Sequence, residues 1–177
     1  LAWSPDSKQI AYTCRKKEGV QYAISTDADI YLYDVATKTT RNLCKPADYK
    51  EPAVDATKSM RDQAVNHQQG DMHVGYDQDP KFSPDGNYIA WQSMKRDGYE
   101  SDRNRLCVLN LKTGQETYVT ESFDSNVDDF CWSNDSKSLY FIGCWQAQVN
   151  LYSTNLKGDV QLWKSDDYGF GDFGSLQ

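Results

Sequence analysis

A ten-residue string occurs three times along this chain. It reads WSPDSKQIAY at 3–12, FSPDGNYIAW at 82–91 and WSNDSKSLYF at 132–141. The middle copy carries Ser, Pro, Asp and Gly in the order that suits the four positions of a type I β-turn. An apolar, strand-like run follows each turn. This repetition constrains the fold more than any other feature, because each copy has to form the same supersecondary unit.

A second string recurs downstream of each turn, at 30–43, 106–119 and 149–162. The copies IYLYDVATKTTRNL, LCVLNLKTGQETYV and VNLYSTNLKGDVQL align without gaps as an apolar run, a polar turn and a shorter run that ends in Leu or Val. That order is typical of a β-hairpin. Each unit therefore predicts four short antiparallel strands, one on each side of the Ser-Pro-Asp turn and two in the second hairpin.

The third strand of the second unit, 106–111, is apolar at almost every position, which indicates a sheet covered on both faces. Four-stranded antiparallel sheets that pack face to face, at about 40 to 50 residues per unit, form a β-propeller. The step from Phe82 to Trp132 is 50 residues and fits, whereas the step from Trp3 to Phe82 is 79 and requires an insertion. A two-sheet sandwich is not expected to repeat the same turn and strands without gaps.

We predict an all-β fold, namely a β-propeller fragment with about three four-stranded antiparallel blades plus the start of a fourth. The predicted parts are blade 1 at about 1–44, an inserted linker at about 45–80, blade 2 at about 81–120, blade 3 at about 121–163 and the start of the next blade at about 164–177. Within the linker, residues 57–69 lack Gly and Pro and predict a short helix. Because the chain begins inside a repeat and without Met, we expect it to be a piece of a larger protein.

Charge and composition exclude some classes of partner. The net charge of −7 and the pI near 4.8 argue against nucleic acid or an anionic membrane surface. No apolar run reaches the length of about 18 residues that a membrane span needs. The five cysteines cannot all pair with each other, and we interpret them mostly as small buried hydrophobic residues. Their number does not decide the compartment.

The repeated turn and the L-x-V/Y-x-D/N strand after it resemble the WD40-like propeller repeat of the prolyl oligopeptidase family (S9) of serine peptidases, the TolB translocation protein and tricorn-like proteases. The string DPKFSPDGNYIAWQSMKRDGYESDRNRLCVLNLKTGQETYVT, at 79–120, is most similar to the dipeptidyl-peptidase and acylaminoacyl-peptidase branch. This resemblance implies an N-terminal propeller that gates the access of short peptides to a C-terminal α/β-hydrolase domain. It also favours a periplasmic or secreted location over a cytoplasmic one. The alternative is a non-catalytic, TolB-like propeller that binds protein partners.

No catalytic centre is expected in these residues. The family's nucleophile lies in a Gly-x-Ser-x-Gly elbow, which this sequence lacks, and both histidines, His67 and His73, fall in the insertion. We therefore expect the fragment to be inactive alone, and we predict no cofactor.

Three motifs that could bind a ligand are better explained without one, so we predict no metal site. GFGDFG at 169–174 matches a dinucleotide fingerprint but lacks the required βαβ context. DSNVDDFCWSND at 124–135 is an imperfect calcium loop through which a strand should run. His67, Asp71 and His73 are interpreted as part of a surface loop, because no matching pair of Cys or His residues supports a metal site.

The most informative loop is KRDGYESDRNR at 95–105, between the second and third strands of the second unit. In a propeller this loop and the inserted linker lie on the same rim. The resemblance implies that carboxylates on such a rim pair with a peptide's α-amine, and that Arg binds a carbonyl or carboxylate. A solvated hairpin remains the alternative, and no clear double-glutamate motif for an amine is present. The predicted contacts with substrate or with the hydrolase domain are Arg96, Asp97, Tyr99, Glu100, Asp102 and Arg103.

A partial ring leaves the faces and edges of its terminal blades uncovered. We therefore expect the isolated fragment to self-associate through these faces.

Overall fold

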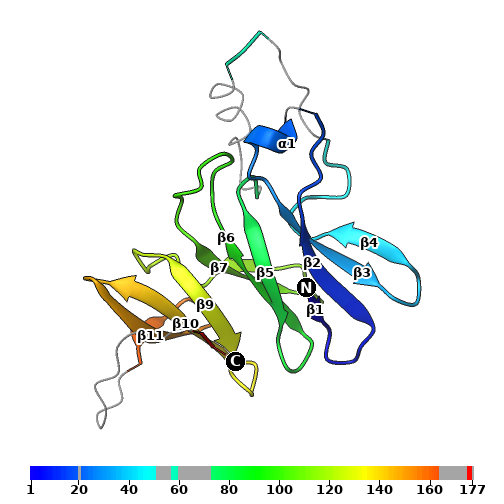
Figure 1. Ribbon diagram of the computed structural model, residues 1–177. Coiled ribbons are helices and arrows are strands. Elements are labelled where there is room, and N and C mark those ends of the chain that lie inside the picture. The colour runs from blue at the N-terminus through cyan, green and yellow to red at the C-terminus, as the bar shows by residue number, and fades with distance from the viewer. Residues whose placement is uncertain (20, 51–56, 60–72, 164–174, 177) are drawn as a thin grey trace.

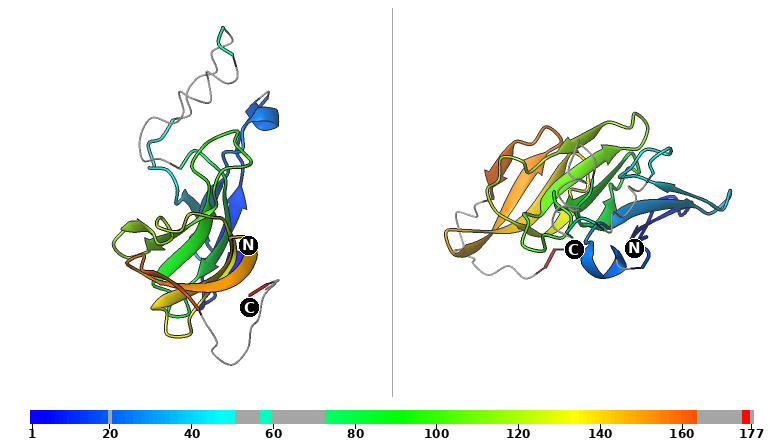
Figure 2. Two further views of the ribbon diagram at one scale, coloured as in Figure 1. Left: turned by 90° about the vertical axis from the view of Figure 1, so that its left-hand side faces the viewer. Right: turned by 90° about the horizontal axis from the view of Figure 1, so that it is seen from above.

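The computed structural model describes residues 1–19, 21–50, 57–59, 73–163 and 175–176. They form three four-stranded antiparallel sheets that follow one another in chain order, as Figures 1 and 2 show, and one short helix, α1 (Gln21–Ile24). The first sheet contains β1 (Ala2–Trp3), β2 (Gln9–Cys14), β3 (Asp29–Asp34) and β4 (Thr39–Asn42). The second contains β5 (Asp77–Phe82), β6 (Tyr88–Ser93), β7 (Arg105–Asn110) and β8 (Glu116–Tyr118). The third contains β9 (Val127–Trp132), β10 (Ser138–Trp145), β11 (Gln148–Asn155) and β12 (Val160–Leu162).

Each sheet is an up-and-down meander, and the first strands β1, β5 and β9 lie next to each other across the sheets. This is the arrangement of propeller blades, in which the first strand is innermost. The predicted all-β propeller fold is confirmed. β5 begins at Asp77, a few residues before the predicted start of its unit, and β9 runs through the sequence that mimics a calcium loop. Most of the predicted helix at 57–69, and all of 169–174, lie outside the described residues.

The Ser-Pro-Asp turn is closed by a serine–aspartate pair. In the second sheet the hydroxyl of Ser83 donates to Asp85 at 2.6 Å and accepts the backbone N–H of Tyr88 at 3.0 Å. The backbone N–H of Gly86 donates to the carbonyl oxygen of Ser83 at 2.9 Å, and Gly86 has a left-handed φ of 69°. Glycine suits this position because it lacks a Cβ.

The other two turns keep the same bonds with different residues. Ser4 donates to Asp6 and Ser133 donates to Asp135, both at 2.7 Å. The left-handed position is held by Ser7 in the first turn and Ser136 in the third, with φ of 59° and 60°. The third turn has Asn134 in place of Pro and still forms, because the serine–aspartate pair does not involve that residue.

The packing of strand β7 explains why apolar and polar residues do not alternate in its sequence. Leu106 and Val108 pack in the core between the second and third sheets, whereas Cys107 and Leu109 pack in the core between the first and second. Both faces of the second sheet are therefore buried. Full burial of each such side chain contributes about 1.5 to 3 kcal/mol relative to exposure.

The junctions between successive sheets repeat in detail. At the first junction the backbone N–H of Asp77 donates to the carbonyl oxygen of Ala28 at 2.9 Å. At the second, the N–H of Val127 donates to the carbonyl oxygen of Asn104 at 3.0 Å. Asp77 and Val127 are 50 positions apart, and Ala28 and Asn104 are 76 apart. Residues of the first two strands of the second sheet therefore correspond to residues 50 positions later in the third sheet. Residues of the last two strands of the first sheet correspond to residues 76 positions later in the second sheet.

Gly143 lies at the bulge where the pairing of β9 and β10 shifts. A Cβ built there would approach two ring carbons of Phe123 to 2.7 Å and the carbonyl oxygen of Asn126 to 2.9 Å. We expect Gly143→Ala to lower the free energy of unfolding by about 2 kcal/mol or more, because the ring and the backbone must both move. Urea denaturation followed by tryptophan fluorescence measures this loss.

Gly114→Ala is the matched control, since a Cβ there meets no atom within 4 Å and only the left-handed φ of 73° is unfavourable. We expect a loss of about 1 kcal/mol for it. Equal losses for the two variants would contradict the steric argument.

Candidate functional site

Two loops and one linker segment meet at one end of the sheets, shown at the top of Figure 1. They are 15–28, between β2 and β3; 94–104, between β6 and β7; and 73–76, directly before β5. Tyr76 bridges Ala28 in parallel, and its carbonyl oxygen accepts the N–H of Met94 at 3.0 Å. We call these three segments the rim. Its two loops connect strands of two different sheets, so the relative position of its side chains depends on the first junction.

Asp97 fastens the two loops to each other. Its Oδ1 accepts the hydroxyl of Ser25 at 2.8 Å and the backbone N–H groups of Thr26 and Asp27 at 2.7 and 3.2 Å. The backbone N–H of Gly98 donates back to the hydroxyl of Thr26 at 2.8 Å. Asp97 is only 4% exposed. Its carboxylate is thus engaged in joining the first sheet to the second.

Asp102 holds the 94–104 loop in shape. It accepts the backbone N–H groups of Lys95 and Arg96 at 3.1 and 2.8 Å and the guanidinium of Arg96 at 2.9 Å. Burial would raise the pKa of Asp102, but the hydrogen bonds and charge of Arg96 outweigh it and keep this pKa below its ordinary value. The guanidinium of Arg96 also lies 4.3 Å from the ring centroid of Tyr99. These three predicted residues therefore bind one another.

Arg103 reaches towards the third sheet. It donates to the carbonyl oxygen of Phe123 at 2.7 Å and lies 3.5 Å from the carboxylate of Glu121, which also pairs with Arg105 at 3.1 Å. At the positions 76 residues earlier stand Asp27, Asp29 and Lys45.

These earlier residues form the same pairs with the charges reversed. The ammonium of Lys45 lies 2.7 Å from the Asp27 carboxylate and 2.9 Å from the Asp29 carboxylate. Two units therefore use the same geometry, an ion pair between the start of the third strand and the segment after the fourth. Because the ion pair of Arg103 recurs at the corresponding positions of the first unit, it belongs to the architecture of the repeat.

Glu100 differs from its neighbours. It is exposed, and within the described part of the chain it forms no hydrogen bond or ion pair. It lines a hollow of about 710 Å³ between the two loops of the rim. The other residues that line it are Thr13, Cys14, Arg15, Tyr22, Thr26, Ala28, Tyr76 and Met94.

The hollow is also lined by the positively charged side chain of Arg15, which the sequence analysis did not select. The guanidinium of Arg15 donates to the carbonyl oxygen of Ser25 at 2.8 Å and lies 4.5 Å from the ring centroid of Tyr22, on α1. The signal that could have found it is the repeat itself, because 15–28 joins the same two strands of the first unit as 95–105 does in the second. One carboxylate and one guanidinium thus lie beside aromatic walls.

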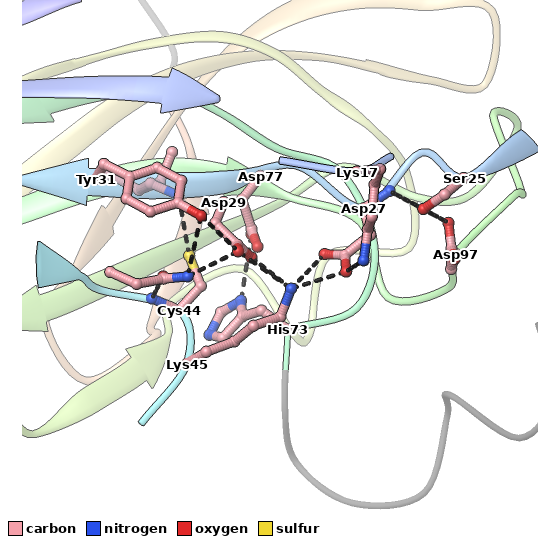
Figure 3. A network of polar contacts seen from close by, with 12 residues as sticks. Lys17, Ser25, Asp27, Asp29, Tyr31, Cys44, Lys45, His73, Asp77 and Asp97 are labelled. Carbon is pink, nitrogen blue, oxygen red and sulfur yellow. Dashed lines mark hydrogen bonds and ion pairs between the residues drawn. The ribbon is translucent and has the colours of Figure 1, made fainter. Parts of the chain in front are cut away.

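A second polar cluster, which includes His73 of the rim, is buried at the first junction (Figure 3). The imidazole of His73 lies 3.2 Å from Asp77 Oδ1 through Nδ1 and 2.8 Å from Glu116 through Nε2. The indole N–H of Trp91 donates to the same Asp77 oxygen at 2.9 Å. Burial would lower the pKa of His73, but its hydrogen bonds to the two carboxylates and their charges raise it to about 10.

The prediction that His73 belongs to a surface loop is wrong. His73 is 4% exposed and Asp77 is fully buried, because the segment before β5 enters the junction and does not pass over it. His67 and Asp71, the other residues of that predicted loop, lie outside the described residues. Among the described cysteines, Cys44 and Cys107 are buried and Cys144 is exposed, and all are free thiols.

Comparisons with known proteins agree with this architecture. No protein-family profile matches the chain. Dipeptidyl-peptidase 5 of Porphyromonas gingivalis is 42% identical over 174 residues, which are 98% of this chain and 22% of that protein. Dipeptidyl-peptidase 5 of Porphyromonas endodontalis is 46% identical over 157 residues, 89% of this chain and 19% of that protein. The chain is a homologue of one segment of dipeptidyl-peptidase 5. It spans about a fifth of the length of these relatives.

Solved structures also match this chain in fold. TolB from Acinetobacter baumannii matches with a TM-score of 0.53 at 18% identity, over 93% of this chain and 31% of that one. The acylaminoacyl peptidase of Pyrococcus horikoshii matches with a TM-score of 0.54 at 13% identity, over 89% and 23%. At these identities the likeness shows the fold. Together with the dipeptidyl-peptidase 5 relatives, it confirms the predicted resemblance to the propellers of S9 serine peptidases. In the described part of the segment, no helix has the length and apolar character needed to cross a membrane.

The role of Asp97 can be tested by stability. We expect Asp97→Ala to lower the free energy of unfolding by about 2 to 4 kcal/mol, because it leaves buried donors of the 25–27 segment without an acceptor. Asp97→Asn, which keeps the acceptor oxygen without the charge, should lose less. Thermal unfolding of the variants measures both.

Glu100→Gln is the matched control for Asp97, because it changes a carboxylate of the same loop that binds nothing in the described chain. We expect its stability to stay within about 0.5 kcal/mol of the parent. A loss for Glu100→Gln as large as that for Asp97→Ala would show that the loop tolerates no change in charge, and would remove the case for a specific fastening role.

Proposed function

We propose that this segment belongs to the substrate-gating propeller of a dipeptidyl-peptidase-like serine peptidase that acts on short peptides. The observation that carries the proposal is the 42% identity to dipeptidyl-peptidase 5 over 98% of the chain. The propeller fold with two rim loops supports it, because such a ring admits short peptides and excludes folded proteins. The reaction itself, acyl transfer, would take place on a C-terminal α/β-hydrolase domain with its own Gly-x-Ser-x-Gly elbow. No cofactor is needed for that chemistry.

The hollow of the rim suits the free end of a peptide. The carboxylate of Glu100 can pair with an α-ammonium group, and the guanidinium of Arg15 can donate to a carbonyl or carboxylate oxygen of the same ligand. The rings of Tyr22 and Tyr76 supply apolar walls. Of the predicted contact residues, we propose Glu100, with Arg96 and Tyr99 beside it, as those that meet the peptide or the hydrolase domain.

Asp97, Asp102 and Arg103 take a supporting part in this proposal. Their hydrogen bonds go to the two loops and to the next sheet, so they position the rim and leave recognition to their neighbours. We propose the blade divisions given by the repeats, at about 1–44, 81–120 and 121–163, with a further blade from about 164–177 and more blades completing the ring.

The first experiment uses the full-length protein with chromogenic dipeptidyl and N-acyl-aminoacyl substrates, with and without a serine-directed fluorophosphonate. We expect release from dipeptidyl substrates that the probe abolishes. Folded protein that shows neither release nor labelling would overturn the peptidase proposal and favour the alternative, a TolB-like propeller that binds protein partners.

The role of Glu100 has its own test in the same assay. Since a hydrogen bond to a charged group contributes about 1.5 to 3 kcal/mol, we expect Glu100→Gln to raise KM for free-amine dipeptidyl substrates by about 10-fold or more. The KM for N-acylated substrates should not change. Glu18→Gln is the control, because Glu18 is an exposed carboxylate of the other rim loop that does not line the hollow. Equal effects of Glu100→Gln on both kinds of substrate would refute amine recognition.

We also propose that the 177-residue segment self-associates when it is produced alone. Its terminal sheets carry large exposed apolar side chains, with Trp3, Trp145 and Trp163 exposed by 54%, 46% and 50%. In a complete ring, neighbouring blades would cover such surfaces. Light scattering over a range of concentrations should show a mass that grows with concentration. A monodisperse monomer at all concentrations would contradict this.

A further inference from the structure

The two junctions between sheets are built from corresponding positions but from different chemistry. At the second junction Phe123 packs on Phe141, with ring centroids 5.2 Å apart. The residues 50 positions earlier are His73 and Trp91, whose ring centroids lie 5.7 Å apart at the first junction. Val127 of the second junction likewise corresponds to Asp77 of the first.

Cys44 has a counterpart too. Its sulfur accepts the backbone N–H of Ile30 at 3.2 Å, and 76 positions later the hydroxyl of Thr120 accepts the N–H of Leu106 at 2.8 Å. The second junction therefore packs with Thr, Phe and Val where the first has Cys, His and Asp. Because the second junction forms from apolar rings and a hydroxyl, packing alone does not require the three metal-binding residue types at the first.

Burying this polar set is unfavourable unless a partner satisfies it. Cys44, His73 and Asp77 are 6%, 4% and 0% exposed. Asp77 Oδ1 accepts two hydrogen bonds, but its other carboxylate oxygen, Oδ2, is buried and has no hydrogen-bond partner among the described residues. A buried carboxylate oxygen without a donor is the feature expected of a cation ligand.

The three side chains also converge. One ligand atom from each, the sulfur of Cys44, a ring nitrogen of His73 and a carboxylate oxygen of Asp77, all lie within 4.8 Å of one another. Figure 3 shows them side by side, supplied by the end of the first sheet and the start of the second. Thiolate, imidazole and carboxylate together suit Zn²⁺, whereas Ca²⁺ and Mg²⁺ prefer oxygen ligands alone.

Glu116 completes the arrangement. It binds Nε2 of His73 at 2.8 Å and keeps 29% of its side chain exposed, whereas Nδ1 faces the buried Asp77. Metal-binding histidines usually donate their second N–H to a carboxylate in this way, which orients the ring and selects the ligating nitrogen. A second possible set, His73 with Cys107 and Glu116, shares the histidine but lacks a free buried oxygen.

We propose that Cys44, His73 Nδ1 and Asp77 bind a zinc ion that clamps the first junction, with Glu116 orienting the histidine. The ion displaces the thiol proton of Cys44 and the Nδ1 proton of His73, both of which leave to solvent, and nothing is oxidised or reduced. Cys44 lies two residues after β4 and His73 lies four residues before β5, so the ion would tie the end of the first sheet to the start of the second. The proposed site does not depend on the peptidase proposal.

The test uses the full-length protein, stripped with a chelator and titrated with Co²⁺ or Zn²⁺. We expect one ion per chain by mass spectrometry of the metal, a thiolate-to-cobalt charge-transfer band with Co²⁺, and a higher melting temperature with Zn²⁺. The variants Cys44→Thr, His73→Phe and Asp77→Val introduce the residues of the second junction, so they have a native precedent for packing. Each should lose at least tenfold in metal affinity, and Cys44→Thr should also lose the band.

Cys144→Ser, at an exposed cysteine, is the control and should bind as the parent does. Folded parent protein that takes up no stoichiometric ion, or shows no thiolate band, would overturn the proposal without any variant. Binding that survives Cys44→Thr and disappears in Cys107→Val would overturn it as well, because the ion would then occupy the neighbouring set. If Cys44→Thr does not fold, retention of the band in Cys107→Val supports the proposal and its loss refutes it.

Discussion

The burial of both faces of the second sheet is the constraint on which the rest of this structure depends. Strand β7 supplies alternate residues to two different cores, so the second sheet is stable only with a neighbour on each side. This requirement brings the loops of two sheets together at the rim and places the start of β5 inside a junction. The candidate recognition hollow and the buried polar cluster are both consequences of blade-to-blade packing, since neither is contained in one sheet.

The repeats also supply an internal comparison that separates architecture from function. The ion pairs of Asp27 and Asp29 with Lys45 recur with reversed charges as those of Arg103 and Arg105 with Glu121. An ion pair between the start of the third strand and the segment after the fourth is therefore a property of the repeat unit. Which of the two sides carries the positive charge can differ between units. Where the units differ without an architectural reason, as at the two junctions, a specific role is the better explanation.

The similarity to dipeptidyl-peptidase 5 and the geometry of the rim support two parts of the same proposed function, access to the peptidase and orientation of the peptide. In this proposal, a ring of blades would restrict which molecules enter, and a few side chains at the rim would orient those that do. Orientation requires a rigid support, which Asp97 supplies by fastening the loop at 94–104 to the loop at 15–28. A clamp at the first junction would stiffen the same support, because Cys44 follows the last strand of the first sheet and His73 precedes the first strand of the second.

The sequence by itself determined the three units, the four strands in each and the turn chemistry, because these depend on patterns within about a dozen neighbouring residues. It also indicated the family, since the turn and strand motif repeats along the chain. It could not separate Asp97 and Arg103, which support the fold, from Glu100, which forms no hydrogen bond or ion pair with the described residues, because all three are charged residues of one loop. It also misplaced His73, since a polar insertion predicts a surface loop. Only the tertiary structure decided these points, because Asp97 and His73 have hydrogen-bond partners, Ser25 and Glu116, that lie 72 and 43 positions away in the sequence.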